Sequence, residues 1–180
     1  MTKRNYLMQS AMEECKMRVF AISGYSGTGK TSLVEAIVKS LVKSGHTVAT
    51  IKSSKHEASP DQGTDTWRHV QAGASMTIFL GPSMEQASLK ERIGPSDLDE
   101  LSKYDYLIVE GLKSFNIPRF WCVGDAELNQ DEIPVNTQAI VSWSDRADAP
   151  SIDLPIFISN EIEELVKIVR EKSVDISEIE

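Results

Sequence analysis

Residues 17–45, MRVFAISGYSGTGKTSLVEAIVKSLVKSG, decide the fold of this chain. They open with a continuous apolar run from Val19 to Ile22, which is typical of a strand buried on both faces of a parallel sheet. The segment from Gly24 to Thr31 follows at once and fits the pattern G-x-x-x-x-G-K-[ST]. Apolar residues then recur at helical spacing from Leu33 to Leu41, up to the helix-ending Gly45. The stretch therefore predicts a strand, a glycine-rich loop and a helix in direct succession.

The glycine-rich loop is suited to binding phosphate groups. Glycines permit backbone conformations that side chains forbid, so that successive N–H groups can converge on phosphate oxygens. The helix that follows directs its positive end at the same oxygens. We expect Lys30 to reach the terminal phosphates and the Thr31 hydroxyl to hold Mg²⁺; the alternative is a glycine-rich turn without a ligand. The candidate nucleotide-binding residues of the loop are Gly24, Ser26, Gly27, Thr28, Gly29, Lys30, Thr31 and Ser32.

Short apolar runs alternate with helical patterns along the rest of the chain. Further strands are predicted at residues 48–51, 76–80, 106–109, 120–123, 139–141 and 156–158. We expect helices to begin at Thr64 or Asp65, at Ser96 and at Asn160, whose side chains can cap them. With the glycine-rich loop, this alternation predicts an α/β fold of the P-loop NTPase class, with a mainly parallel sheet and helices on both faces.

The length of 180 residues is that of one domain. We expect a nucleotide-binding domain over residues 17–172. Residues 1–16 are polar and precede the first strand, so we expect a flexible extension there. Residues 173–180 are acidic, and we expect them to form a frayed tail.

Composition narrows the choice of partners. Lys and Arg number 19 against 27 Asp and Glu, a net charge of −8, which argues against sequence-independent binding to nucleic acid. No apolar run approaches the roughly 20 residues that span a bilayer, and the N-terminus lacks the apolar stretch of a secretory signal. Cys15 and Cys122 form no metal or redox pattern, and we expect both as reduced thiols. We therefore predict a cytoplasmic protein that binds neither nucleic acid nor a membrane.

Two acidic residues are candidates for binding Mg²⁺. Glu110 ends a buried strand, and ligands of parallel sheets bind at the carboxyl ends of the strands. Asp65 stands at a helix start after the second strand. Thr31, Asp65 and Glu110 are thus the candidate metal residues, and Lys30 and Glu110 the candidate catalytic residues. The alternatives are a solvated glutamate at a strand end and an aspartate that only caps its helix.

The segment between residues 52 and 69 concentrates charged side chains at the same predicted edge of the sheet. Lys55, His56 or Arg68 could bind anions there, and the alternative for His56 is an ordinary surface residue. A zinc site is not expected, because His56 and His69 lack the helical spacing and the cysteine partners that such sites use.

A possible base site follows the strand at residues 139–141. Guanine presents N–H donors at N1 and N2, so that the Asp145 carboxylate could accept both, while Trp143 could stack on the purine. The alternative is a polar turn in which Trp143 lies in the core and Asp145 faces Arg146 or solvent.

The ordered blocks GYSGTGKTS, KSSKHE, D-x-x-G-x-D-T-W-R-H-x-x-A-G-A and LIVEGLK resemble the molybdopterin-guanine dinucleotide biosynthesis protein B (MobB) family over roughly residues 17–170. The resemblance implies a dimeric GTP-binding protein with weak GTPase activity. It implies an accessory role in attaching GMP to molybdopterin, beside a separate guanylyltransferase. Carried over to this chain, Gly24 to Thr31 would bind phosphates, and Thr31, Glu110 and Asp65 would serve Mg²⁺.

Two departures from the family pattern stand out. Family members often carry paired histidines where this chain has Lys55-His56, and Arg119 begins a strand that the family usually begins with lysine. Phe115, Phe120 and Trp121 could form an apolar dimer patch, or Phe120 and Trp121 could lie in the core. The rival functions are an ATP-dependent ligase or kinase resembling dethiobiotin synthetase, and a non-catalytic nucleotide-dependent adaptor.

Overall fold

The computed structural model describes residues 17–54, 64–81, 87–144 and 152–179. Its strands are β1 (Arg18–Gly24), β2 (Val48–Ser53), β3 (Met76–Leu80), β4 (Tyr106–Glu110), β5 (Arg119–Gly124), β6 (Thr137–Ser142), β7 (Ile156–Ile158) and β8 (Val174–Asp175). Its helices are α2 (Lys30–Lys43), α3 (Asp65–Gln71), α4 (Leu89–Ile93), α5 (Pro95–Leu101) and α6 (Ile162–Lys172), with 3-10 turns η1 (Gln130–Glu132) and η2 (Ile176–Glu178). Each strand predicted from the sequence is present.

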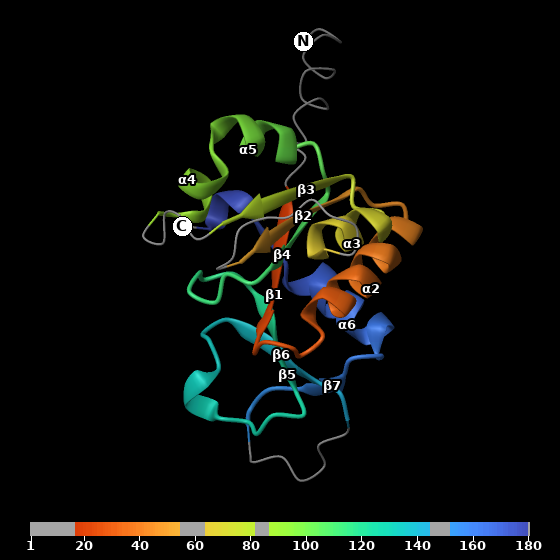
Figure 1. Ribbon diagram of the computed structural model, residues 1–180, viewed down its shortest axis with the longest axis vertical. Coiled ribbons are helices and arrows are strands. Elements are labelled where there is room, and N and C mark those ends of the chain that lie inside the picture. The colour runs from red at the N-terminus through yellow and green to blue at the C-terminus, as the bar shows by residue number, and fades with distance from the viewer. Residues whose placement is uncertain (1–16, 55–63, 82–86, 145–151, 180) are drawn as a thin grey trace, which may run out of the picture.

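One sheet organises the described residues, in the order β3-β2-β4-β1-β5-β6-β7. These seven strands pair in parallel. Helices α2, α3 and α6 lie on one side of the sheet and α4 and α5 on the other (Figure 1). The predicted α/β fold, with a mainly parallel sheet and helices on both faces, is therefore confirmed. Strand β1 lies between β4 and β5, so the loop that follows it opens at the middle of the sheet's carboxyl edge.

Alternate residues of β1 face the two sides of the sheet, as the pleat requires. Phe20 and Ile22 pack in the core beneath α2 and α6, whereas Val19 and Ala21 pack in the core beneath α4 and α5. Because both faces are covered, the strand reads in the sequence as a continuous apolar run rather than as an alternation. A third cluster, centred on Trp121, covers β5 and β6 on the α4 side.

The ends of three helices differ in part from expectation. Thr64, rather than Asp65, caps α3 by accepting a hydrogen bond from the Trp67 amide. Ser96 does not cap α5, because Pro95 occupies the first position of that helix and Gly94 precedes it. Asn160 does not cap α6, whose N-cap residue is Glu161 with no side-chain cap hydrogen bond.

The expectation of a frayed acidic tail is wrong. Val174 and Asp175 pair antiparallel with Val19 and Arg18 of β1, and Ile179 is buried in the core beneath α4 and α5. β5 pairs with β1 only from Ala21 onward, so that Arg18 and Val19, on the same side of β1, can pair with β8.

Two of the three aromatic residues considered for a dimer patch lie in the core. Phe120 and Trp121 are buried, and Phe115 packs partly buried against the core beneath α4 and α5. The rings of Phe20 and Phe120 meet edge to face at 4.7 Å. The core interpretation of these residues is therefore confirmed. Within the described residues, no helix has the length and apolar character needed to cross a bilayer.

Candidate functional site

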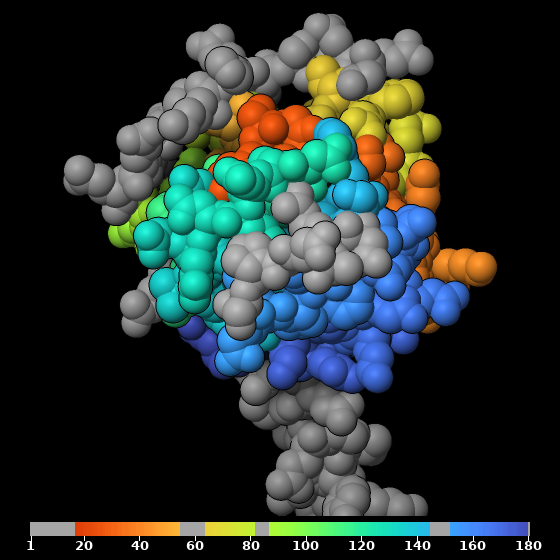
Figure 2. Space-filling model, turned by 90° about the horizontal axis from the view of Figure 1, so that it is seen from below, coloured from red at the N-terminus to blue at the C-terminus, as the bar shows by residue number. Residues whose placement is uncertain are grey.

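The glycine-rich loop turns tightly between β1 and the N-terminus of α2. A Cβ atom on Gly24 would lie 2.0 Å from the carbonyl oxygen of Cys122, so this position admits no side chain. Gly27 and Gly29 have φ angles of 73° and 79°, a region that favours glycine. In Figure 2, the red-to-orange loop after β1 reaches the surface beside the teal segment that contains β5.

The first turn of α2 lacks the side chains that usually accept hydrogen bonds from the free backbone N–H groups at a helix N-terminus. Its N-cap residue, Gly29, offers no side-chain acceptor, and no acidic residue lies in the first turn. By contrast, Thr64 caps α3 and Ser88 caps α4 through their side chains. The free amides and the positive end of the α2 dipole suit an anion at this point.

Lys30 is held inside the loop. Its ammonium donates to the carbonyl oxygen of Tyr25, and the Thr28 hydroxyl donates to the same oxygen at 2.9 Å. Burial lowers the pKa of Lys30, and the Glu110 charge opposes this effect. The lysine is therefore positioned and partly desolvated before any ligand arrives, and its charge interacts more strongly with an anion there than it would in bulk water.

Glu110 forms the centre of a buried polar cluster. Its side chain is 1% exposed and accepts hydrogen bonds from Thr31 Oγ1 at 2.9 Å, from the Lys52 ammonium and from His69 Nε2 at 3.0 Å. Burial by itself would raise the pKa of this carboxyl, but the His69 hydrogen bond and the Lys52 charge outweigh it and hold the pKa below its ordinary value. The alternative of a solvated glutamate at the strand end is therefore wrong.

Lys52 joins the two acidic candidates. Its Nζ lies 2.5 Å from Asp65 Oδ2 and also contacts Glu110 Oε1. Burial would lower the pKa of Lys52, but the two carboxylates outweigh burial and raise it. Burial likewise would raise the pKa of Asp65, but Lys52 and then Thr31 outweigh it and lower the pKa. Asp65 therefore does not only begin its helix; it forms an ion pair at the edge of the sheet.

His69 belongs to this cluster, and the sequence analysis did not select it as a site residue. Its ring is fully buried in α3, and Nε2 faces the Glu110 carboxylate, so Nε2 carries the proton in that hydrogen bond. Nδ1 has no hydrogen-bond partner among the described residues. The spacing of Asp65 and His69, four residues apart on one helix face, is the signal that could have joined them.

Arg68, a predicted anion ligand, instead links α3 to α2 through hydrogen bonds. Its Nε donates to Glu35 Oε1 at 2.6 Å and its Nη2 to Ser32 Oγ at 3.0 Å. The Glu35 hydrogen bond raises the pKa of Arg68. Lys55 and His56, the other candidates of this segment, lie outside the described residues.

Trp143 stands beside the glycine-rich loop. The side chain is 49% exposed, and Nε1 donates to the carbonyl oxygen of Thr28 at 3.2 Å. The alternative in which Trp143 lies in the core is therefore wrong. Asp145, its predicted companion in base recognition, lies outside the described residues.

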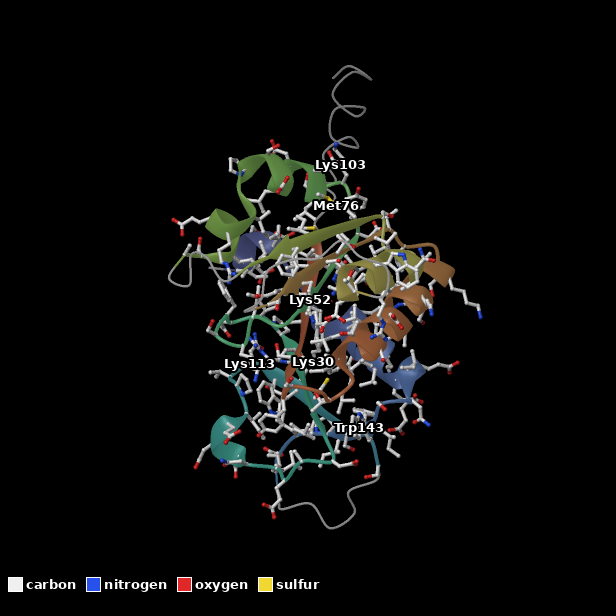
Figure 3. All side chains as sticks on the ribbon, viewed as in Figure 1. Lys30, Lys52, Met76, Lys103, Lys113 and Trp143 are labelled. Atoms are coloured by element: carbon white, nitrogen blue, oxygen red, sulfur yellow. The ribbon has the colours of Figure 1, made fainter. Side chains whose placement is uncertain are left out.

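A cavity of about 640 Å³ opens at this edge of the sheet. Lys30 and Lys52 lie near the middle of the fold, with Lys113 to one side of Lys30 and Trp143 to the other (Figure 3). The cavity is lined by Gly24, Ser26, Lys30, Lys52, Ser53, Ser54, Asp65, Gly81, Arg92, Gly111, Leu112, Lys113 and Ser114. Four of the candidate phosphate and metal residues, Gly24, Ser26, Lys30 and Asp65, thus share one cavity with several residues that the sequence analysis left unassigned.

The family described as molybdopterin guanine dinucleotide synthesis protein B (MobB) matches residues 19–143. The chain belongs to the MobB family. The molybdopterin-guanine dinucleotide biosynthesis adapter protein of Haemophilus influenzae is 36% identical over 108 residues, which cover 56% of this chain and 60% of that protein. The putative adapter protein of the same name from Methanocaldococcus jannaschii is 35% identical over 133 residues, 69% of this chain and 55% of that protein. The matched region therefore spans a little over half the length of these two MobB relatives.

Solved structures agree on the fold. The crystal structure of Bacillus subtilis MobB matches with a TM-score of 0.57 and 24% identity, covering 88% of this chain and 99% of that one. At this level of identity the likeness is one of fold. It supports the assignment of the chain to the α/β P-loop NTPase class, as the glycine-rich loop and the parallel sheet do.

Proposed function

We propose that this chain binds GTP together with Mg²⁺ at the glycine-rich loop and acts as an accessory factor in molybdopterin guanine dinucleotide biosynthesis. The observation that carries the nucleotide part is the first turn of α2, which has neither a side-chain cap nor an acidic residue and begins with the half-buried Lys30. The biosynthetic role rests on membership of the MobB family. Family membership favours this role over an ATP-dependent ligase or kinase.

The residues around Glu110 fit a magnesium ion. Thr31 and Glu110 are already hydrogen-bonded to each other, and the Asp65 carboxylate approaches from α3. Hydroxyl and carboxylate oxygens are the ligands that Mg²⁺ prefers. The Lys52 ammonium, which bridges the two carboxylates, is evidence that a positive charge is stable at this point. When bound, Mg²⁺ would neutralise charge on the phosphate oxygens of the nucleotide.

The residues of this chain then have distinct roles. Lys30 would bind the terminal phosphates and stabilise charge that develops on them. His69 would hold the Glu110 carboxylate in one orientation through Nε2. Lys52 would have to release Glu110 Oε1 before a metal ion could bind that oxygen, because the same oxygen accepts the Lys52 hydrogen bond. Hydrolysis should be slow without a partner that supplies an arginine, since such a residue is worth about 10³–10⁵ in turnover.

Base recognition, the dimer and the partner belong to the same proposal. Trp143 beside the loop would stack on the base, and Asp145 would accept the guanine N–H groups. A molybdenum cofactor guanylyltransferase would be the protein partner, and the chain would act as a homodimer, which light scattering at micromolar concentration tests directly. A cytoplasmic location remains a prediction.

Titration of GTP and ATP by calorimetry, with and without Mg²⁺, tests the proposal. Lys30→Ala should weaken triphosphate binding by about 1.5–3 kcal/mol, the value of a charge-assisted hydrogen bond. Lys39→Ala, which removes a lysine from the exposed face of the same helix, should leave binding unchanged. Equal GTP affinity in Lys30→Ala and the wild type would contradict the proposal. Single-turnover hydrolysis separates a slow GTPase from a non-catalytic adaptor.

A further inference from the structure

Lys52 places a positive charge among the three oxygens proposed to hold Mg²⁺. Its Nζ lies 2.5 Å from Asp65 Oδ2 and donates to Glu110 Oε1, the oxygen that also accepts the Thr31 hydroxyl at 2.9 Å. We propose that this ammonium excludes free Mg²⁺ from the site and gives up its place only to Mg²⁺ that arrives with a nucleotide, whose phosphates then accept the ammonium. The inference rests on the proposed function, because it takes Thr31, Asp65 and Glu110 as the metal residues.

The hydrogen bonds of Glu110 make Lys52 a direct competitor of a metal ion. Oε2 accepts from His69 Nε2 at 3.0 Å, so Oε1 is the oxygen that faces Thr31 and Lys52. The side chain of Glu110 is 1% exposed and that of Lys52 is 14% exposed. Two cations on one oxygen repel each other more strongly in such a place than in bulk water. A metal ion can therefore gain Oε1 only when the ammonium leaves it.

The carboxylates that Lys52 joins suit a divalent cation better than an ammonium. Glu110 and Asp65 carry two negative charges, and the single ammonium between them carries one positive charge. The other cation beside the site, Lys30, donates its hydrogen bond to the Tyr25 carbonyl oxygen rather than to a carboxylate. A structural ion pair needs only one carboxylate, and a second one adds repulsion that a divalent ion offsets more fully. This pairing therefore favours a metal site closed by its own lysine over a purely structural contact.

Lys52 can be released without any movement of the main chain. It lies in β2 directly opposite Glu110 of β4 in the parallel register, so the sheet fixes its backbone. Its ammonium stands at the end of a flexible four-carbon stem, which can turn about several bonds. Because the ammonium is attached to the strand, it competes for the carboxylates at a high effective concentration. The lysine is thus both permanent at the site and movable within it.

The phosphates of a nucleotide at the glycine-rich loop would lie within reach of Lys52. Lys52 lines the same cavity as Gly24, Ser26 and Lys30, and Figure 3 shows Lys52 and Lys30 in the same central region of the fold. Burial is the main cause of the lowered pKa of Lys30, and the charge of Lys52 contributes to it, so the two ammonium groups act on each other. An ammonium binds phosphate oxygens through charge-assisted hydrogen bonds, as it binds carboxylates. Nucleotide binding therefore offers Lys52 a replacement for both carboxylates.

The test titrates Mg²⁺ alone into the full-length protein without nucleotide and follows backbone amide signals by NMR. Lys52→Gln removes the charge and keeps an amide that can donate hydrogen bonds. This variant should bind Mg²⁺ about tenfold or more tightly than the wild type, because the metal no longer has to break a charge-assisted hydrogen bond. Lys52→Arg keeps the charge and should bind Mg²⁺ no more tightly than the wild type. A purely structural role for Lys52 predicts no gain in Mg²⁺ affinity, and that result would overturn the inference.

A second titration tests whether the nucleotide releases Lys52. A non-hydrolysable GTP analogue is titrated by calorimetry with and without saturating Mg²⁺. Mg²⁺ and the nucleotide strengthen each other's binding by the same factor. That factor should be about tenfold smaller in Lys52→Gln than in the wild type, because the variant has no ammonium for the nucleotide to remove. An unchanged factor would mean that Lys52 opposes the metal equally in both states, which contradicts release by the nucleotide.

Two further variants serve as controls. Lys39→Gln, on the exposed face of α2, should match the wild type in both titrations. Adding Glu110→Gln to Lys52→Gln should abolish the gain in Mg²⁺ affinity, and a gain that persists would place the metal elsewhere and overturn the inference. If Lys52→Gln is unfolded without metal, Mg²⁺ should restore its native circular dichroism spectrum, since a ligand of the native state stabilises it. Failure of Mg²⁺ to restore that spectrum would also overturn the inference.

The two proposals fail in different ways. If the GTP analogue does not bind the wild type with Mg²⁺, the proposed function fails, and the titration of Mg²⁺ alone still decides whether Lys52 excludes the metal. If the analogue binds the wild type but Lys52→Gln gains no Mg²⁺ affinity, the inference about Lys52 fails and the nucleotide proposal stands.

Discussion

Replacing Lys52 by methionine tests the buried polar cluster around Glu110 in the candidate site. Methionine preserves most of the length and apolar contact of the lysine stem and removes the ammonium group, with its charge and its hydrogen-bond donors. The side chain of Lys52 is 14% exposed, and that of its partner Glu110 is 1% exposed. The substitution therefore leaves one buried carboxylate and one half-buried carboxylate close together without the cation between them.

The expected cost is about 3 kcal/mol of unfolding free energy. Removing one partner of a buried ion pair costs about 3–5 kcal/mol, because the remaining charge is desolvated and uncompensated. The lower end applies here because Thr31 and His69 still donate to Glu110 and because Asp65 is 37% exposed. Lys52→Met with Glu110→Gln should be less destabilised than the sum of the single variants, by about 2 kcal/mol.

Urea denaturation at neutral pH, followed by circular dichroism without Mg²⁺ or nucleotide, measures these free energies. With a slope of about 1–3 kcal/mol per molar urea, the midpoint for Lys52→Met should fall by about 1–3 M. Lys39→Met, on the exposed face of α2, should change stability by less than about 0.5 kcal/mol. A midpoint for Lys52→Met equal to that of the wild type, or strict additivity in the double variant, would refute this account of the cluster.

Three further predictions concern the loop and its surroundings. In the same urea titration, Gly24→Ala should lower the unfolding free energy by more than about 3 kcal/mol, because its Cβ would lie 2.0 Å from a carbonyl oxygen. Gly45→Ala is the comparison: Gly45 has a positive φ in open space, and the variant should lose only about 1–2 kcal/mol of unfolding free energy. In a Cys15→Ser background, native Cys122 should resist iodoacetamide at pH 9 and react after denaturation, because burial raises the pKa of its thiol to about 12; rapid native labelling would contradict this. Trp143→Ala should weaken GTP and ATP equally, by about 1–3 kcal/mol, and a selective loss of GTP would assign it a different role.

The sequence was sufficient to predict the part of the fold that surrounds the glycine-rich loop. The apolar run before Gly24, the spacing up to Thr31 and the helical period after it are local features, and local periodicity reports secondary structure directly. Glu110 could also be placed, because the carboxyl ends of parallel strands meet at one edge of a sheet. The tail was misjudged because its pairing with Arg18 and Val19 joins segments at opposite ends of the described chain.

Within the site, the sequence identified the acidic residues and the tertiary structure decided their partners. Three sets of contacts depend on which strands and helices become neighbours. They are the Lys52 bridge between Asp65 and Glu110, the hydrogen bond between His69 and Glu110, and the hydrogen bond from the Arg119 guanidinium to the Leu112 carbonyl oxygen. No spacing along the chain encodes those distances. Burial also depends on the tertiary structure. Trp121 in β5 is buried, whereas Trp143, directly after β6, is exposed, although both are tryptophans. Side-chain exposure and charge compensation arise from packing between distant segments, whereas the glycine-rich loop arises from eight consecutive residues, 24–31.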